Sequence, residues 1–427
     1  MTDNSRILSL LNPTLYMHPT LRYLTLLTAT LSLLACEPEV VTLTTPNQEG
    51  FSDPMDLRFS AAEMTKLNEE LSLPAEISTM SVTLPRHIRQ RTFISEVTNS
   101  ESDARKAVLG RVLFYDKALS ATGETSCATC HLQEKAFADP KAFSQGINGQ
   151  VTKRNSIALG SVPTFAPVVS GYGSSGDENT SAVEGNVKFF WDERAGTIKE
   201  QSEATIQDEL EMGSDLHQLS SDLRKREIYQ ILSMKAFGTT NLTPDRITLA
   251  LERFTATMVA TNTRFDQLRD AELSGTIANG NFTEQELLGD RLFEMNCAGC
   301  HGHNLTEPAV NVANNGLDGV YADKGVGLIS RQAHDNGVFK VPFLRNVALT
   351  GPYMHDGRFE TLAEVIDHYS EGIQDHRNLH PLLKDSHFNA RRMNFSAEEK
   401  AALVAFLEMT TDESLLTDAA LSDPFRR

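Results

Sequence analysis

Two copies of the pattern Cys-x-x-Cys-His constrain this chain more than any other feature. They are Cys127-Ala128-Thr129-Cys130-His131 and Cys297-Ala298-Gly299-Cys300-His301. The pattern is the attachment site of c-type haem, in which the two thiols hold the porphyrin and the imidazole binds the iron. Two copies therefore predict two covalently bound haems, and a fold that encloses each of them.

Three other uses of a cysteine pair compete with haem attachment: a redox dithiol, a disulfide and half of a zinc site. The chain has 5 cysteines, and four of them lie in the two patterns. A zinc site would have to join pairs separated by residues 131–296, which is unlike the compact spacing of zinc modules. A redox dithiol does not require an adjacent His, here present twice. Haem attachment is therefore the favoured interpretation.

The fifth cysteine, Cys36, ends the sequence Leu-Leu-Ala-Cys after an apolar run from Tyr23 to Leu34 that follows Arg22. This layout is typical of an export signal that ends in a lipoprotein cleavage site. The run is too short to span a bilayer comfortably. We expect a periplasmic protein whose membrane attachment is a lipid on Cys36. A plain signal peptide cut nearby, which would leave a soluble exported protein, is the alternative.

The charge balance limits the partners. The formal net charge is −18, from 39 basic and 57 acidic side chains. This balance argues against nucleic acid or an anionic membrane surface as a partner. It mildly favours a basic docking partner, and a contribution to solubility alone is the alternative.

The chain divides into four predicted segments. Residues 1–36 form the signal peptide with its lipoprotein site, and residues 37–98 form a polar tether and N-terminal extension with weak structural signals. Residues 99–270 form the first haem domain and residues 271–427 the second, with the connection somewhere in 263–281.

An internal duplication is visible before the two haem patterns. Gly110-Arg111-Val112-Leu113-Phe114 precedes the first as Gly289-Asp290-Arg291-Leu292-Phe293 precedes the second. Capping boxes predict helix starts at Thr283, Thr361 and Ser396. Strand-like alternation is scarce. We therefore predict a mainly α fold of two cytochrome-c-like domains, each with one covalently bound c-type haem.

Further motifs extend from about Asp103 to Met409. They are Leu109-Gly110-Arg111, Leu113-Phe114-Tyr115-Asp116, Arg154-Asn155-Ser156, Phe190-Trp191-Asp192-Glu193-Arg194-Ala195, Glu211-Met212-Gly213, Val341-Pro342-Phe343-Leu344-Arg345-Asn346-Val347 and Pro352-Tyr353-Met354-His355-Asp356-Gly357. In these motifs the chain resembles the bacterial di-haem cytochrome c peroxidases and the MauG-type enzymes. In that family the N-terminal haem meets peroxide and the C-terminal haem takes in electrons.

The resemblance implies roles at the first haem. Family members held inactive by a distal His carry it just before Arg-Asn-Ser, but residues 143–153 contain no His. We therefore expect His131 to be the sole protein ligand of this iron. By position, Glu211 is the expected acid/base and Gln201 its distal hydrogen-bonding neighbour. An ordinary solvated helix carboxylate is the alternative for Glu211.

The resemblance also implies roles around the second haem. Trp191 corresponds to a family residue between the haems and is the expected electron bridge, although core packing would also suit it. His301 is the expected proximal ligand. Tyr369 stands where peroxidases of the family have Met and MauG has Tyr, and it is the expected distal ligand. His368 and Met354 are the alternatives.

A calcium ion between the haems is a further implication of the family. The matching positions are Asn155 for a side-chain oxygen and Thr350 and Pro352 for carbonyl oxygens, a ligand type that suits calcium. His355 matches a family His near the inter-haem region. Glu193 departs from the family pattern, in which Gly is usual at this position.

These implications lead to three functional hypotheses. The first is an exported peroxidase that reduces hydrogen peroxide with electrons from a small donor cytochrome c or a cupredoxin. The second is a MauG-like enzyme that uses peroxide to oxidise residues of a protein substrate, which the missing distal His and Tyr369 favour. The third is a di-haem electron carrier without catalysis, against which Glu211 and the expected open iron argue.

Overall fold

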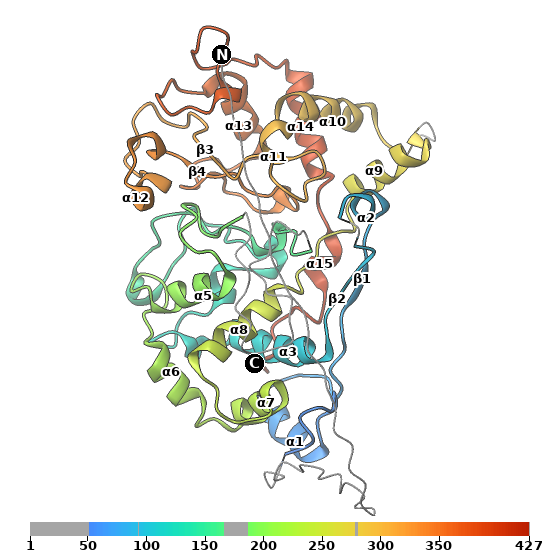
Figure 1. Cartoon of the computed structure of the whole chain (residues 1–427), viewed down its shortest axis with the longest axis vertical. Coiled ribbons are helices and arrows are strands. Elements are labelled where there is room, and N and C mark those ends of the chain that lie inside the picture. The colour runs from blue at the N-terminus through green and yellow to red at the C-terminus, as the bar shows by residue number, and fades with distance from the viewer. Residues whose placement is uncertain (1–50, 93, 166–186, 278–280, 427) are drawn as a thin grey trace, which may run out of the picture. The chain divides into compact units, whose positions relative to one another are not determined.

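The structure is a computed structural model, and it describes residues 51–92, 94–165, 187–277 and 281–426. All of them belong to one compact unit, Gln48–Arg427. The unit is mainly helical, as the sequence predicts (Figure 1). The predicted signal peptide and Cys36 lie outside the described residues. Within these residues, every helix is too short or too polar to cross a membrane.

The helices and strands of the first half precede residue 256. They are α1 (Ala61–Glu70), β1 (Ser81–Thr83), α2 (Arg86–Thr92), β2 (Glu96–Thr98), α3 (Glu101–Tyr115), α4 (Cys127–Cys130), α5 (Ile198–Gln207), α6 (Leu216–Leu223), α7 (Glu227–Phe237) and α8 (Pro244–Thr255). Strands β1 and β2 pair antiparallel, with Val82 opposite Val97.

The elements of the second half follow residue 263. They are α9 (Arg264–Ser274), α10 (Glu284–Asn296), α11 (Ala298–His301), β3 (Val312–Ala313), α12 (Val326–Ser330), β4 (Phe339–Lys340), α13 (Leu362–Asp367), α14 (Ala397–Glu408) and α15 (Glu413–Thr417). Strands β3 and β4 also pair antiparallel. The capping boxes at Thr283, Thr361 and Ser396 begin α10, α13 and α14, which confirms these three predicted starts.

The same helix crossing occurs in both halves. α3 packs on α8, and α10 packs on α14. At the first crossing, a Cβ on Gly110 would lie 1.9 Å from the Ala250 carbonyl oxygen. At the second, a Cβ on Gly289 would lie 1.9 Å from the Ala402 carbonyl oxygen. Only glycine permits such a close backbone approach, so the repeated Gly has a packing reason and supports the duplication that the sequence indicates.

The N-terminal extension is folded onto both halves, although its sequence signals are weak. Leu67 of α1 belongs to the first core, and α1 packs on α7. Helix α2 packs instead on α9. The Asp270 carboxylate of α9 accepts hydrogen bonds from the backbone N–H groups of Arg86 and His87, at 3.0 and 2.8 Å. Thus a residue of the second half satisfies the start of α2.

The C-terminal tail returns to the first half. Leu415 and Leu421 belong to the first core, and Gln133 Nε2 donates to the Leu415 carbonyl oxygen at 3.0 Å. Helix α9 runs across the sequence-based boundary at 270/271, and its Phe265 belongs to the second core. We therefore propose a junction at residues 256–263, with residues 412–426 assigned to the first domain.

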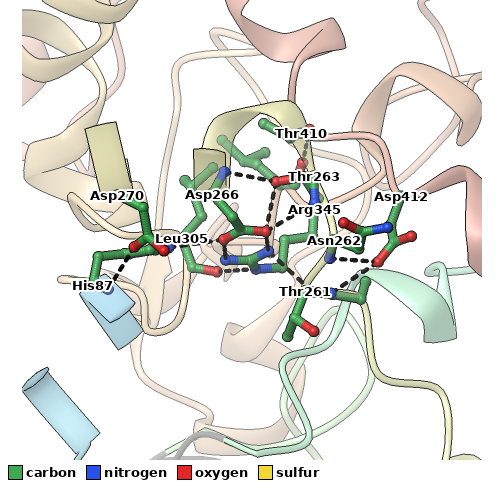
Figure 2. Close-up of polar contacts among 12 residues, drawn as sticks. His87, Thr261, Asn262, Thr263, Asp266, Asp270, Leu305, Arg345, Thr410 and Asp412 are labelled. Atoms are coloured by element: carbon green, nitrogen blue, oxygen red, sulfur yellow. Dashed lines mark hydrogen bonds and ion pairs between the residues drawn. The ribbon is translucent and has the colours of Figure 1, made fainter. Parts of the chain in front are cut away.

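A buried polar cluster lies at this junction (Figure 2). Arg345 is fully buried, and its guanidinium donates to both carboxylate oxygens of Asp266, at 2.8 and 3.0 Å, and to the carbonyl oxygen of Leu305. His87 Nε2 lies 2.9 Å from the same Asp266 carboxylate. Burial alone would raise the pKa of Asp266, but Arg345 and the hydrogen bonds hold it well below its usual range. The cluster therefore ties α2, α9 and the Arg345 segment together.

Candidate functional site

The residues predicted for the first haem line one cavity. Cys127 and Cys130 come from α4, with His131 directly after it, and Gln201 comes from α5. Glu211 follows α5 in a turn in which its backbone N–H donates to the Asp208 carbonyl oxygen. The structure therefore brings together residues that lie more than eighty positions apart in the sequence.

The His131 imidazole is oriented by the backbone. Its Nδ1 lies 2.8 Å from the Phe137 carbonyl oxygen, so Nδ1 carries the proton and Nε2 keeps its lone pair for a metal. Ser156 Oγ lies 3.4 Å from Nε2, at the long end of hydrogen-bond distances. Burial lowers the pKa of His131, which favours the neutral imidazole that metals bind.

A second cavity is built in the same way around the second pattern. Cys297, Cys300 and His301 line it together with Tyr369 and Met354. His301 Nδ1 lies 3.1 Å from the carbonyl oxygen of Pro342, and burial lowers the pKa of His301 to about 4. His301 thus repeats the arrangement of His131.

Tyr369 lies in a π-helical turn, His368–Gly372, a conformation that is frequent at functional sites. Burial raises the pKa of its phenol to about 12, so ionisation at neutral pH requires a nearby cation. His368 is absent from the cavity lining, and its Nε2 lies 3.1 Å from the Asn315 carbonyl oxygen. Of the three candidate ligands, Tyr369 and Met354 are the two that line this cavity.

The four thiols of the patterns fit haem attachment better than redox exchange. All four cysteines are free. Burial raises the pKa of Cys127 and Cys297 to about 12 and that of Cys130 to about 11, whereas reactive dithiols have a lowered thiol pKa. Each pair lines a cavity next to an imidazole whose Nδ1 faces a backbone carbonyl oxygen. A c-type haem fits this donor set in both cavities.

Glu211 has the electrostatic environment of an acid/base group. Burial, together with the neighbouring Asp208 carboxylate, raises the pKa of Glu211 to about 7. A hydrogen bond from the Thr205 side chain and the charge of Arg194 oppose this rise. A group with a pKa near the working pH is suited to proton transfer.

The loop that precedes Arg154 packs directly on the Glu211 turn. The backbone N–H of Ile147 donates to the Glu211 carbonyl oxygen at 3.2 Å. A Cβ on Gly146 would lie 1.7 Å from the Leu210 carbonyl oxygen, so only glycine fits there. Among the described residues, His131 is the one imidazole that lines the first cavity. Met212 is also part of its lining.

Trp191 lines both cavities, and so do Asn155, Ser156 and Ile157. Its indole Nε1 donates to the Asn155 carbonyl oxygen at 2.9 Å. The residue therefore stands in the wall between the two sites.

The three residues predicted to hold calcium, Asn155, Thr350 and Pro352, are all part of the lining of the second cavity. Asn155 Nδ2 faces the Lys141 and Ala142 carbonyl oxygens, at 3.2 and 3.5 Å, which leaves the amide oxygen for a cation. This donor set fits a hard cation such as calcium. The described residues contain no cluster of three or more His, Cys, Asp or Glu ligands.

Arg154 forms a charged bridge beside Trp191 that no sequence motif predicts. Arg154 donates to both carboxylate oxygens of Asp323, at 2.7 and 2.9 Å, and lies 2.7 Å from Asp192. Asp323 belongs to the second half and lines the first cavity. Asp323 is not part of any recognisable motif, so its place could be found only from the fold.

Comparisons with known proteins agree with this geometry. A family model described as di-haem cytochrome c peroxidase matches residues 104–273, and one described as cytochrome c matches residues 287–411. The methylamine utilization protein MauG of Methylophilus methylotrophus is 30% identical over 321 residues, 74% of this chain and 85% of that protein. The cytochrome c551 peroxidase of Nitrosomonas europaea is 30% identical over 328 residues, 75% and 83% respectively.

A crystal structure of a MauG-like protein associated with microbial copper homeostasis is 30% identical and has a TM-score of 0.61. The match covers 75% of this chain and 93% of that one. Together these similarities confirm the predicted fold class of two cytochrome-c-type domains.

Proposed function

The chain belongs to the di-haem cytochrome c peroxidase family, which includes the MauG proteins, and we propose that it reduces hydrogen peroxide to water at the first cavity with electrons that enter through the second. It is an oxidoreductase of the di-haem peroxidase type, and its cofactors are haems. The proposal depends mainly on one observation: Glu211 and Gln201 share a cavity with His131, and no other imidazole among the described residues lines it.

The side chains around the first cavity have distinct tasks in this proposal. A bound c-type haem supplies an iron that binds peroxide and exchanges electrons. Glu211 takes a proton from one peroxide oxygen and returns it to the other, since its pKa of about 7 leaves both protonation states accessible. Gln201, which lines the same cavity, would offer an amide hydrogen bond to the peroxide. Trp191, which lines both cavities, carries electrons between them.

The remaining parts of the proposal concern location, partners and calcium. We infer export to the periplasm, with a lipid on Cys36 as the membrane attachment. The electron donor is a small cytochrome c or a cupredoxin, and one calcium ion is held by Asn155, Thr350 and Pro352. The shared cavity lining of these three residues supports the calcium site.

A MauG-like oxidation of a protein substrate is the second candidate. Two observations favour it: Tyr369 in the second cavity, and the missing His in residues 143–153. A steady-state assay of the holoprotein with hydrogen peroxide and a reduced small cytochrome c separates the two. Sustained turnover supports the peroxidase, and negligible turnover with long-lived oxidised haem bands supports protein oxidation. A ferric spectrum that is wholly low-spin and unchanged by peroxide would refute both and favour an electron carrier.

Replacement of Tyr369 by Met is expected to raise the reduction potential of the second haem by on the order of 100 mV, because a phenolate stabilises ferric iron whereas a thioether raises the potential. Spectroelectrochemical titration of the holoprotein measures this shift. Met354→Leu is the matched control, since Met354 lines the same cavity. If Met354→Leu changes the potential and Tyr369→Met does not, Met354 is the ligand.

A further inference from the structure

One residue of the second half, Lys340, holds the segment that carries Trp191. The Lys340 backbone N–H donates to the Trp191 carbonyl oxygen at 2.8 Å. Its Nζ donates to the Lys188 carbonyl oxygen at 2.7 Å and lies 3.3 Å from Oε1 of Glu193. Lys340 therefore contacts Lys188 before the tryptophan, Trp191 itself and Glu193 after it. Lys340 lies on β4, so this restraint crosses between the two halves.

The Lys340 and Glu193 pair is buried, which sets it apart from an ordinary surface ion pair. Their side chains are 5% and 13% exposed. Burial lowers the pKa of Lys340 and raises that of Glu193, and the attraction between the two groups opposes both shifts. A buried charge is costly without its partner, so each of these residues needs the other.

The backbone around Trp191 is in an unfavourable conformation. Phe190 and Glu193 have φ angles of +65° and +54°, in the left-handed region that non-glycine residues rarely adopt. Residues in this region cost free energy and persist only where their surroundings hold them. The bond from the Phe189 N–H to the Ala195 carbonyl oxygen, at 2.8 Å, closes the turn but does not reach the indole. The contacts of Lys340 hold the part of the turn in which the indole is attached.

We propose that Lys340 and Glu193 are positioning residues that fix the Trp191 indole between the two cavities. The Asn155 carbonyl oxygen accepts from the indole nitrogen, the Lys340 N–H donates to the Trp191 carbonyl oxygen, and Glu193 pairs with the Lys340 ammonium group. The functional consequence, control of electron transfer between the haems, rests on the bridging role proposed above for Trp191. The positional effect itself does not depend on that role.

The sequence has a single tryptophan, so its fluorescence reports this residue alone. In the holoprotein, energy transfer to the haems shortens the fluorescence decay according to the distance and orientation of the indole. Lys340→Met is expected to make the decay longer and heterogeneous, and Lys340→Arg to restore much of the native decay. Lys324→Met is the matched control, because it removes the same charge from an exposed side chain of the same half. An unchanged decay in Lys340→Met, or an equal change in Lys324→Met, would overturn the proposal.

The rate of electron transfer between the haems can be measured after a light pulse that reduces one of them. This rate tests whether the position of Trp191 controls the transfer. We expect Lys340→Met to slow it by about 10- to 100-fold, in line with the effect of small misplacements on other reactions. In a Trp191→Phe background the same substitution should have no further effect. If Trp191→Phe alone leaves the rate unchanged, the bridging role fails, while the fluorescence decay still decides the positioning role.

Glu193→Gly is a second test of the proposal, for use if the Lys340→Met variant does not fold. Glycine suits the positive φ of this residue, so the backbone loses its strain while the carboxylate is removed. The proposal requires the decay to lengthen in this variant too. A native decay in Glu193→Gly would show that the ion pair does not position the indole.

Discussion

Replacement of Glu211 by Gln slows the reaction of the holoprotein with hydrogen peroxide by an expected 10²- to 10⁴-fold, roughly the contribution of a positioned acid/base group. The amide keeps the size and hydrogen-bonding ability of the side chain but cannot take up the peroxide proton. Stopped-flow absorbance at the haem bands measures the rate, and mass measurement checks that both haems stay attached.

The pH dependence of the peroxide reaction rate is a second test of the role of Glu211. The carboxylate acts as base, so the wild-type rate is expected to rise as the pH rises through about 7, the pKa to which burial and Asp208 bring Glu211. The Glu211→Gln variant should lose this rise. Glu209→Gln is the matched control, because Glu209 is exposed and absent from the cavity lining. Equal rates in the two variants would reject the role of Glu211.

Replacement of Arg345 by Met is expected to lower the free energy of unfolding by about 3–5 kcal/mol, the usual cost of breaking a buried ion pair from one side. The substitution leaves the Asp266 carboxylate, 3% exposed, without its bidentate partner. It also leaves the Leu305 carbonyl oxygen without the Arg345 donor. Denaturant titration of the holoprotein, followed by far-ultraviolet circular dichroism, measures the loss.

Two further variants show whether the loss of stability in Arg345→Met arises because the ion pair is buried. Lys225→Met removes an exposed partner of Asp222, with side chains 68% and 53% exposed, and should cost less than about 1 kcal/mol. The double variant Arg345→Met/Asp266→Leu should be less destabilising than the sum of its single changes, because no unpaired charge remains. A loss as small as that of Lys225→Met would contradict the assigned role of the cluster.

Local signals in the sequence predicted the parts of the fold that depend on neighbouring residues. Capping boxes marked the starts of α10, α13 and α14, and the repeated Gly-x-x-Leu-Phe marked α3 and α10. Residue spacing alone gave the cysteines and imidazoles of both cavities. The family resemblance supplied Glu211, Gln201 and Tyr369, whose side chains share cavities with the haem patterns.

The parts that could not be predicted depend on partners distant in the chain. Helix α2 has a polar sequence. The burial of its His87 is explained by the contact with Asp266, 179 residues later in the chain. The tail after residue 411 carries no sign that it packs on the first half. Asp323 and Lys340 likewise gain their roles from contacts across the two halves, which no local pattern encodes.

The copies of a duplicated domain are usually independent, since each contains its own hydrophobic core. In this chain the two halves are interleaved, because α2 packs on α9 of the second half and the tail with Leu415 packs into the core of the first. The first half, taken alone, would lack Leu415 and Leu421 in its core. The two halves are therefore joined by packing at α2 and at the tail, in addition to the chain that connects them.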